Sequence, residues 1–434
     1  MKFRAVFTVL ALLIISAVLF TGCPDNRETV RVLFYLDASN PTEVRDTNEW
    51  FTTFERNNPN VRIVRENLFD DAYHDKMRTY AAAGDLPEVM YVWPSGRSDY
   101  LHEGRLLKDL GPFIARDGLR NFYLPMTMDP SQQNSGYMAM IPQGVTNTHA
   151  FYINMEVLNE VGLQPARNYA ELVAQVPILR NAGYQTILIP AESTWVMQSC
   201  LFSMIAGRFC GENWHERIIN GQAKFTDPDF VAALDFIRRL YADGVISREA
   251  VGVGYGDGPG MFAGNRGAYY IDGDWRVGDL LQVINRDRQQ NIRISVFPDI
   301  AEAKMNRSNS SVVGVGYAMA ASIPSGSAKE AAAWELVKWL LGKEVSTNRT
   351  ENGGTPTPSR TDLDFGSMDL QPLSIAVGNI GREFDIATVV IDAVFHSDVF
   401  EPINNGLIQL ALGTRTAAQV AADTQNAFDT WKSR

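Results

Sequence analysis

The sequence predicts an α/β protein in which parallel strands carry helices on both faces. The first observation is the order of elements in the first hundred residues, where short apolar segments and helical segments alternate as β-α-β-α-β. Strands joined in this way run parallel, because such a connection needs a dozen or more residues and is usually a helix. The second observation is size. A chain of 434 residues with 45% hydrophobic content can build the cores of two ordinary domains.

The N-terminus has the pattern of a secretory signal. Lys2 and Arg4 precede an apolar run over residues 6–20, which is shorter than the roughly 20 residues that a membrane span needs and typical of a signal h-region. The run ends in Thr21-Gly22-Cys23, which resembles a bacterial lipobox with Phe20 where leucine is usual. We expect a signal peptide over 1–22, lipidation of Cys23 and a short tether over 23–27. An uncleaved anchor, or ordinary secretion with an incidental cysteine, is the alternative.

Charge and hydropathy limit the kinds of partner that the protein can have. The formal net charge is −11 and no basic cluster is present, which argues against nucleic acid. No other stretch is long and apolar enough to span a membrane. We therefore expect an exported, soluble, monomeric body that is lipid-anchored to a bacterial membrane, in the periplasm or on the cell surface.

The sequence contains two further cysteines, Cys200 and Cys210, which could form a disulfide bond. A helix over 197–206 would hold them about 15 Å apart, whereas a disulfide needs Cα atoms within about 7 Å. The bond forms only if the chain turns back near Gly207 or Gly211. Neither a CxxC motif nor a Cys/His metal pattern occurs, so we expect no metal and no cofactor.

The first elements end in polar or aromatic residues. The predicted strands are 30–35, 61–64 and 86–93, and the helix between the first two stops at Pro59, which cannot continue it. Asp37, Asp70 and Trp93 come at strand ends, where open α/β sheets bind ligands. For Asp37 and Asp70, helix capping or turn formation is the alternative.

The middle of the chain alternates between the two kinds of element. Predicted strands are 137–142, 150–154, 186–189, 268–271 and 292–298. The helix opened by Pro228 carries an apolar stripe. Trp195 follows one strand, and Gly273-Asp274-Trp275 follows another. The glycine-rich run 252–260 around Tyr255 lacks the Gly-Lys-Ser/Thr ending of a phosphate loop, and we interpret it as a mobile connection.

The last third contains a glycine-punctuated strand and several helix starts. Glycines in 312–320 suit a hinge, because they accept large backbone changes. Ser327 with Glu330, and Thr416 with Gln419, have capping-box spacing. The segment 354–360 ends in Arg360, which either binds a ligand or a cleft carboxylate, or lies on the surface.

Several motifs occur in the order found in one known family. They are the Phe262–Trp275 pattern F-x-x-G-x-x-A-hydrophobic-x-x-G-x-W, the segment 81–92 with Glu88 where aspartate is commoner, Gly104–Leu110, the segment 142–154 ending Tyr152-Ile153-Asn154, and Gly413–Val420. In this order the motifs resemble the extracellular solute-binding proteins of ABC importers, the sugar-binding group similar to maltose-binding protein. Residues 361–400 match poorly.

This resemblance implies a two-lobe α/β fold with three crossings and a ligand cleft between the lobes. Lobe 1 would comprise 28–147 and 317–358, and lobe 2 would comprise 148–316 and 359–434. The protein would capture a small solute by hinge closure and deliver it to an ABC permease driven by its ATPase.

The aromatic residues favour a sugar or oligosaccharide as the ligand. A pyranose has an apolar face for an aromatic plane and hydroxyls for carboxylates or amides. The candidate ligand-binding residues are Asp37, Asp70, Trp93, Tyr152, Trp195, Tyr255, Asp274, Trp275 and Arg360. For Trp195 and Trp275, packing in the core is the alternative.

Two other functions stay open. The same fold could bind another solute, such as a polyamine or a peptide. A secreted glycan hydrolase would need two carboxylates at a fixed spacing or a nucleophile with a base, and no HExxH or Gly-x-Ser-x-Gly motif is present. We therefore expect no catalytic residue.

Overall fold

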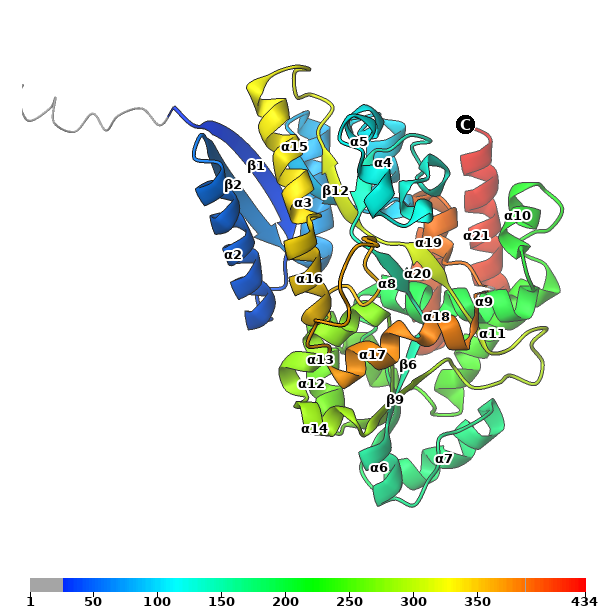
Figure 1. The fold of residues 1–434 in the computed structure, drawn as a ribbon. Helices are drawn as coiled ribbons and strands as arrows, with labels where there is room; N and C mark the ends of the chain where they lie inside the picture. The colour runs from blue at the N-terminus through cyan, green and yellow to red at the C-terminus, as the bar shows by residue number, and fades with distance from the viewer. Residues whose placement is uncertain (1–25, 387) are drawn as a thin grey trace, which may run out of the picture.

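The structure is a computed structural model that describes residues 26–386 and 388–434. The predicted signal peptide and Cys23 lie outside these residues. Figure 1 shows the chain folded around two sheets, each covered by helices. We refer to the body around the five-stranded sheet as lobe 1 and the body around the four-stranded sheet as lobe 2.

Lobe 1 is built on a sheet of order β2-β1-β3-β12-β4. Its strands are β1 (Glu28–Tyr35), β2 (Val61–Leu68), β3 (Val89–Val92), β4 (Met140–Pro142) and β12 (Gly316–Met319). The first three run parallel, while β12 is antiparallel to β3 and to β4. The predicted β-α-β-α-β order is confirmed, and a strand from the last third of the chain completes the sheet.

The helices of lobe 1 share the core of its sheet, and several of them have a recognisable cap. They are α2 (Pro41–Asn57), α3 (Asp70–Ala83), α4 (Asp99–Glu103), α5 (Gly111–Arg116), α15 (Ala328–Leu340) and α16 (Lys343–Glu351), with short 3-10 turns η1 (Gly96–Ser98), η2 (Leu119–Phe122), η3 (Pro125–Met128) and η4 (Pro130–Gln132). The Asn40 side chain caps α2, and Gly84 ends α3 in the left-handed region at φ 64°. Buried side chains of β1, α2, α3 and α15 share one hydrophobic core.

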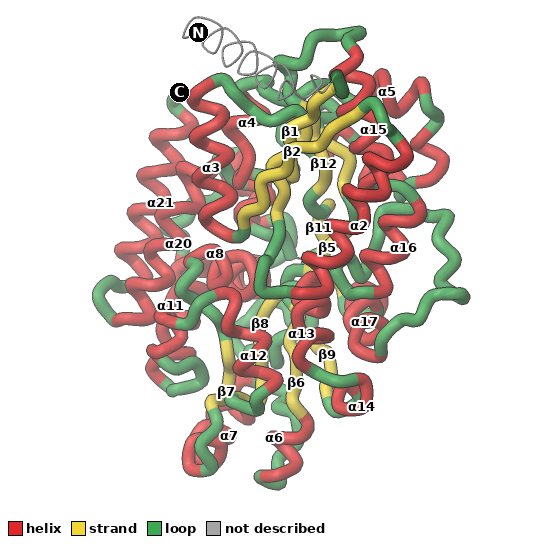
Figure 2. The backbone as a smooth tube through the Cα atoms, turned by 90° about the vertical axis from the view of Figure 1, so that its left-hand side faces the viewer, coloured by secondary structure: helices red, strands yellow, loops and turns green. Residues whose placement is uncertain are grey.

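Lobe 2 is built on a sheet of order β7-β8-β6-β9. Its strands are β6 (Ala150–Asn154), β7 (Gln185–Leu188), β8 (Gly267–Asp272) and β9 (Ile292–Ser295). Strand β6 is antiparallel to β8 and β9, and β7 is parallel to β8. All six residues of β8 are buried, because helices cover both faces of this sheet (Figures 1 and 2).

The helices of lobe 2 form two groups. One group shares a large core and comprises α6 (Met155–Glu160), α7 (Tyr169–Asn181), α8 (Thr194–Val196), the π-helical segment η5 (Met197–Phe202), α9 (Ser203–Cys210), α10 (Trp214–Ile219), α11 (Pro228–Ala242), α19 (Ile391–Val394), α20 (Ser397–Leu412) and α21 (Ala417–Lys432). The other group covers the opposite face and comprises α12 (Gly258–Ala263), α13 (Val277–Val283), α14 (Arg286–Gln289), α17 (Pro372–Gly378) and α18 (Ile380–Glu383). The short pieces η6 (Arg248–Gly252), η7 (Tyr255–Asp257), η8 (Asp274–Arg276), β10 (Ser308–Asn309) and β13 (Asp385–Ile386) complete the chain.

Two sequence-based expectations are decided here. Cys200 and Cys210 are both free and buried, as the continuous helical path from 194 to 210 requires. The run 252–260, expected to be a mobile connection, forms ordered turns instead. Tyr255 is buried, and Pro259 occupies the first turn of α12, where its fixed φ favours the helix.

The segments that join the lobes lie side by side. Strand β5 (Val145–Asn147) pairs with β11 (Ser311–Val313) in antiparallel fashion, and the Val145 N–H donates to the Thr357 carbonyl at 2.9 Å. A Cβ on Gly316 would lie 2.0 Å from the Ile141 carbonyl oxygen. Glycine is therefore required at the start of β12, directly after the crossing, by close contact with the backbone of β4.

Within residues 26–386 and 388–434, no helix has the length and apolarity needed to cross a membrane. The lobe boundaries predicted from the sequence stay a prediction.

Candidate functional site

Strand ends from both lobes converge on one region. In lobe 1, Asp37 follows β1 and Asp70 follows β2. In lobe 2, Trp195 lies beyond β7 and Trp275 lies just beyond β8. Asp70 and Trp195 bond each other directly across the lobes, and the candidate site is built from these strand ends.

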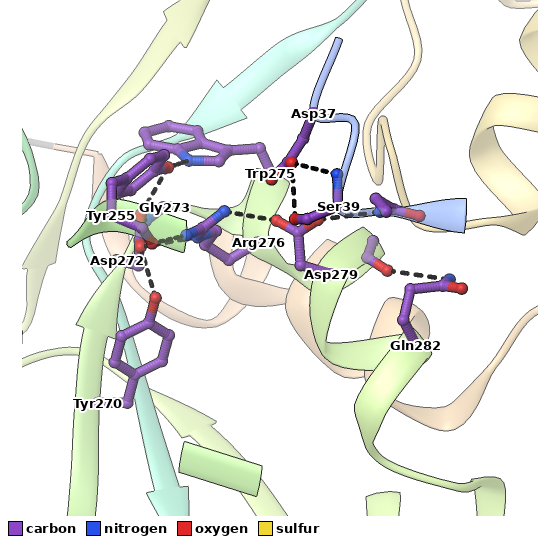
Figure 3. Close-up of polar contacts among 12 residues, drawn as sticks. Asp37, Ser39, Tyr255, Tyr270, Asp272, Gly273, Trp275, Arg276, Asp279 and Gln282 are labelled. Atoms are coloured by element: carbon purple, nitrogen blue, oxygen red, sulfur yellow. Dashed lines mark hydrogen bonds and ion pairs between the residues drawn. The ribbon is translucent and has the colours of Figure 1, made fainter. Parts of the chain in front are cut away.

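Three aromatic side chains of lobe 2 form what we call the aromatic platform: Trp195, Tyr255 and Trp275. The ring centroid of Trp195 lies 4.8 Å from that of Tyr255 and 6.3 Å from that of Trp275. The Trp275 indole N–H donates to the Tyr255 hydroxyl at 2.7 Å (Figure 3). A Cβ on Gly273 would lie 2.2 Å from the Trp275 ring, so only glycine lets the indole lie against the strand end.

Lobe 1 adds an aromatic side chain to this group. The Phe69 ring stacks on Tyr255, with centroids 6.0 Å apart and an interplanar angle of 17°. On its other side, Phe69 contacts Tyr35 at 5.1 Å, and Tyr35 contacts Trp93 at 5.4 Å. The platform therefore continues across the lobe boundary into the aromatic residues around Trp93.

A buried ion pair supports the platform. Asp272, at the end of β8, is fully buried and accepts hydrogen bonds from the Tyr270 hydroxyl at 2.7 Å and from Arg276 Nε at 3.2 Å. Burial raises the pKa of Asp272, while the charge of Arg276 lowers it. The Arg276 guanidinium lies 3.8 Å from the Tyr255 ring centroid and donates to the Tyr255 carbonyl. These contacts fix the orientation of Tyr255, and through it that of Trp275.

One row of inter-lobe contacts lies beside Arg276 (Figure 3). Arg276 Nη1 pairs with Asp279 at 2.5 Å, and Asn40 Nδ2 of lobe 1 donates to the other Asp279 oxygen at 2.9 Å. The Thr42 hydroxyl donates to Gln282 Oε1 at 2.6 Å. Glu43 is the first acidic residue of α2. Burial and the nearby Asp279 carboxylate raise the pKa of Glu43 to about 8.

A second row of contacts lies on the other side of the platform. Asp70 accepts from the Ser193 hydroxyl at 2.6 Å and from the Trp195 indole N–H at 3.2 Å. The Arg97 guanidinium lies 4.4 Å from the Trp195 ring centroid and pairs with Asp392 at 3.2 Å. Asp70 has φ 51°, a left-handed conformation that is uncommon outside glycine and concentrates at functional positions.

The remaining predicted residues lie around or away from this group. Asp37 accepts from the Ser39 N–H and hydroxyl at 2.8 and 2.6 Å (Figure 3). Tyr152 is fully buried under the strand end, where its hydroxyl donates to the Gly273 carbonyl at 2.8 Å. Arg360 pairs with Asp362 at 2.7 Å and packs over Tyr123, apart from the platform.

Asp274 lies between lobe 2 and a crossing strand. Its carboxylate is fully buried, and Oδ2 accepts from the Asn147 backbone N–H at 2.8 Å and from Asn147 Nδ2 at 3.0 Å. Among the residues described, Asp274 Oδ1 has no hydrogen-bond partner. Burial raises the pKa of Asp274 to about 7, against the opposing effect of the Asn147 bonds.

A separate groove of about 990 Å³ opens between the lobes on the outer side of α3 and α4. Its wall includes Tyr100, His396 and Trp431, and His396 Nε2 lies 3.1 Å from Asp99. None of the predicted ligand-binding residues is among its described lining residues.

Sequence reasoning missed five participants: Phe69, Arg97, Asp272, Arg276 and Asp392. The i, i+4 spacing of Asp272 and Arg276 around a strand end was a usable signal. No sequence signal indicated Asp392, because it lies 295 residues from its partner Arg97. It also lies in the part of the chain where the family motifs match poorly.

The comparisons with known proteins agree with the fold. The model of the bacterial extracellular solute-binding protein family matches residues 38–347. A putative ABC transporter periplasmic-binding protein, YcjN of Escherichia coli (strain K12), is 25% identical over 246 residues, which are 54% of each chain. The match thus spans about half the length of this curated relative.

Solved structures match over nearly their full length. A chain from a study of xylan utilization by Caldanaerobius polysaccharolyticus has a TM-score of 0.81 at 19% identity, covering 92% of this chain and 99% of that one. A chitin oligosaccharide binding protein has a TM-score of 0.81 at 17% identity, covering 93% and 99%. The maltose/maltodextrin-binding domain of Bdellovibrio bacteriovorus bound to maltotriose has 0.71 at 18%, covering 94% and 100%. The predicted two-lobe fold is therefore confirmed.

Proposed function

Because this chain belongs to the bacterial extracellular solute-binding protein family of ABC transporters, we propose that it captures a sugar or an oligosaccharide between its two lobes. The family and the matching structures are binding proteins rather than enzymes. The solved relatives include proteins described with maltotriose and with acarbose.

The observation that carries the proposal is the aromatic platform and its polar edges. The half-buried Trp195 and Trp275 offer apolar ring surface beside the buried Tyr255. The Asp70 carboxylate accepts from the Trp195 indole N–H, and the Arg97 guanidinium lies over the Trp195 ring. A pyranose needs both kinds of surface, because its C–H face is apolar and its rim carries hydroxyls that must be hydrogen-bonded when buried.

Closure of the lobes is the proposed mechanism of capture. The platform belongs to lobe 2, whereas Phe69, Asp70 and Arg97 belong to lobe 1. A ligand that contacts both sets binds the closed state better than the open state, and so shifts the population toward closure. The adjacent crossing strands β5 and β11 provide the axis for this movement.

The cellular context completes the proposal. The protein would act as a monomer outside the cytoplasm, held to the membrane by a lipid on Cys23, and would deliver its ligand to an ABC permease. The lipobox-like sequence before Cys23 and family membership support this context.

A second candidate ligand is a cationic solute such as a polyamine. The carboxylates of Asp37, Glu43 and Asp70 all come from lobe 1, and burial together with the nearby carboxylates of Asp279 and Asp37 raises the pKa of Glu43. A cation would neutralise these groups.

Titration of residues 24–434 distinguishes the candidates. Tryptophan fluorescence and thermal stability would be followed against maltotriose, chitotriose, xylotriose and spermidine. We expect saturable stabilisation by a glycan that is recovered intact, with the concentration dependence of native-state binding. Stabilisation by spermidine alone would reject the sugar, and cleavage of a glycan would indicate a hydrolase.

A further inference from the structure

We propose that the turn η8, Asp274–Arg276, couples the position of Trp275 to the contacts that join lobe 2 to the rest of the molecule. The inference rests on the proposed function in one respect, since it assumes that Trp275 meets the ligand. Asp274 and Arg276 are positioning residues in this proposal. They act through Asn147 and Asp279 and do not themselves touch the ligand.

The turn leaves Trp275 little freedom to move alone. Its three residues form a single 3-10 turn directly after Gly273, and the indole lies against the Gly273 backbone. Asp274 and Arg276, on either side, are both buried. A displacement of the indole is therefore transmitted to two side chains that are held at their far ends.

Arg276 connects the turn to lobe 1 through hydrogen bonds. Its Nε bonds Asp272 within lobe 2, while its Nη1 bonds Asp279 at 2.5 Å. The second oxygen of Asp279 accepts from Asn40 Nδ2 at 2.9 Å. A continuous chain of charge-assisted hydrogen bonds, which are stronger than neutral ones, thus runs from Arg276 to the first turn of α2.

Asn40 uses both ends of its side chain. Its Oδ1 accepts from the Glu43 N–H at 3.0 Å and caps α2, while its Nδ2 reaches Asp279. Serine or aspartate at position 40 would keep the capping oxygen but remove the donor to Asp279. The helix cap and the inter-lobe contact can therefore be separated by substitution.

Asp274 connects the turn to the segments that cross between the lobes. Its Oδ2 holds both the backbone and the side chain of Asn147, the last residue of β5, which pairs with β11. Asn147 in turn accepts from Asn309 Nδ2 at 3.1 Å. One side of the turn is thus bonded to the axis of lobe movement, and the other side to the opposite lobe.

A neighbouring contact provides a matched control. The Thr42–Gln282 hydrogen bond also joins α2 to α13, at 2.6 Å. The Gln282 amide, however, bonds back to the Gly278 carbonyl of its own helix and not to the turn. Thr42→Val therefore removes one inter-lobe hydrogen bond without cutting the chain to Trp275.

The deciding measurement needs no ligand. The indole N–H resonance of Trp275, assigned by its loss in Trp275→Phe, is recorded by nuclear magnetic resonance in the mature chain and in Asn40→Ser, Asn40→Asp and Thr42→Val. We expect both Asn40 variants to shift this resonance and Thr42→Val to leave it in place. Inter-lobe distances from spin labels show whether the variants open the lobes equally. A shift that is equal in Asn40→Ser and Thr42→Val, or absent from both Asn40 variants, would overturn the coupling.

A second experiment tests the bond between Asp274 and Asn147. It also separates the proposed role of the turn from the proposal that the ligand is a sugar. Asn147→Ala is expected to shift the same Trp275 resonance, and an unchanged resonance would remove Asp274 from the coupling. In the wild type, maltotriose, chitotriose or xylotriose at saturation should shift the Asn40 side-chain amide. If none of the three binds, the sugar ligand is wrong, while the ligand-free spectra still decide the coupling.

Discussion

At the scale of single residues, the platform makes the most direct prediction. Trp275→Ala and Trp195→Ala each remove a ring that contacts Tyr255 or its hydroxyl. We expect each to weaken binding of the stabilising glycan about ten-fold or more, measured by calorimetric titration. Trp431→Phe, in the outer groove, is the control and should bind as the wild type does. Unchanged affinity in both alanine variants would contradict the role of the platform.

The buried carboxyl group of Asp274 makes a prediction about pH. Its folded-state pKa of about 7 lies above the value near 3.9 of an unfolded aspartate, so the folded state favours the protonated acid. The contribution of Asp274 to stability should fall as pH rises from about 4 to about 7, by up to about 1.4 kcal/mol per pH unit, and should level off above that.

The Asp274→Asn variant tests this assignment. Asparagine retains an acceptor for the two Asn147 donors and does not ionise. Denaturant unfolding of the variant between pH 5 and pH 8 should show a weaker loss of stability with rising pH than the wild type. An identical pH dependence in the two proteins would show that another group titrates.

At the scale of elements, sequence patterns were sufficient where local rules decide the structure. The strands of lobe 1, the helix opened by Pro228 and the capping box at Thr416 follow from periodicity and caps, and the structure confirms them. At Ser327 only half of the predicted capping box forms, because the Ser327 side chain caps the helix while the Glu330 carboxylate bonds the Gly326 N–H. The pairing of β12 between β3 and β4 joins segments more than 170 residues apart and depends on tertiary packing, which no local pattern encodes.

The candidate site shows the same division. Strand ends indicated Asp70 and Trp275, because the end of a strand is readable from the chain. The Arg97–Asp392 pair and the Phe69–Tyr255 stack depend on which face of one lobe meets the other. Their partners come from separate elements, and only the assembled lobes reveal them.

The close pairing of β12 with β4 in the lobe 1 sheet carries a prediction at this scale. Gly316→Ala would place a Cβ 2.0 Å from the Ile141 carbonyl oxygen, so β12 or β4 must shift. We expect a loss of about 2 to 3 kcal/mol in the free energy of unfolding, measured with urea. Gly260→Ala is the matched control, because it lies in α12 with no atom near its Cβ position and should be neutral or slightly stabilising. A small and equal effect of both changes would contradict the tight contact.

At the scale of the whole molecule, the proposed attachment to the membrane depends on one atom, the Cys23 sulfur. Cys23→Ser removes the acceptor for the lipid, so we expect the protein to move from the membrane fraction to the soluble fraction of cells. Fractionation followed by immunoblotting measures this. Retention of the variant on membranes after washing without detergent would show that another part of the chain anchors it.

The free cysteines have a consequence for the study of this molecule as a whole. Cys200 and Cys210 both lie in the core of lobe 2, and burial raises the pKa of each thiol, so neither reacts readily in the folded state. The described part of lobe 1 contains no cysteine. The rate at which a thiol reagent labels the chain therefore reports how often lobe 2 opens, separately from lobe 1. Since the Cys200 sulfur lies 3.8 Å from Asp272, a ligand that tightens the platform should slow labelling of Cys200 more than that of Cys210.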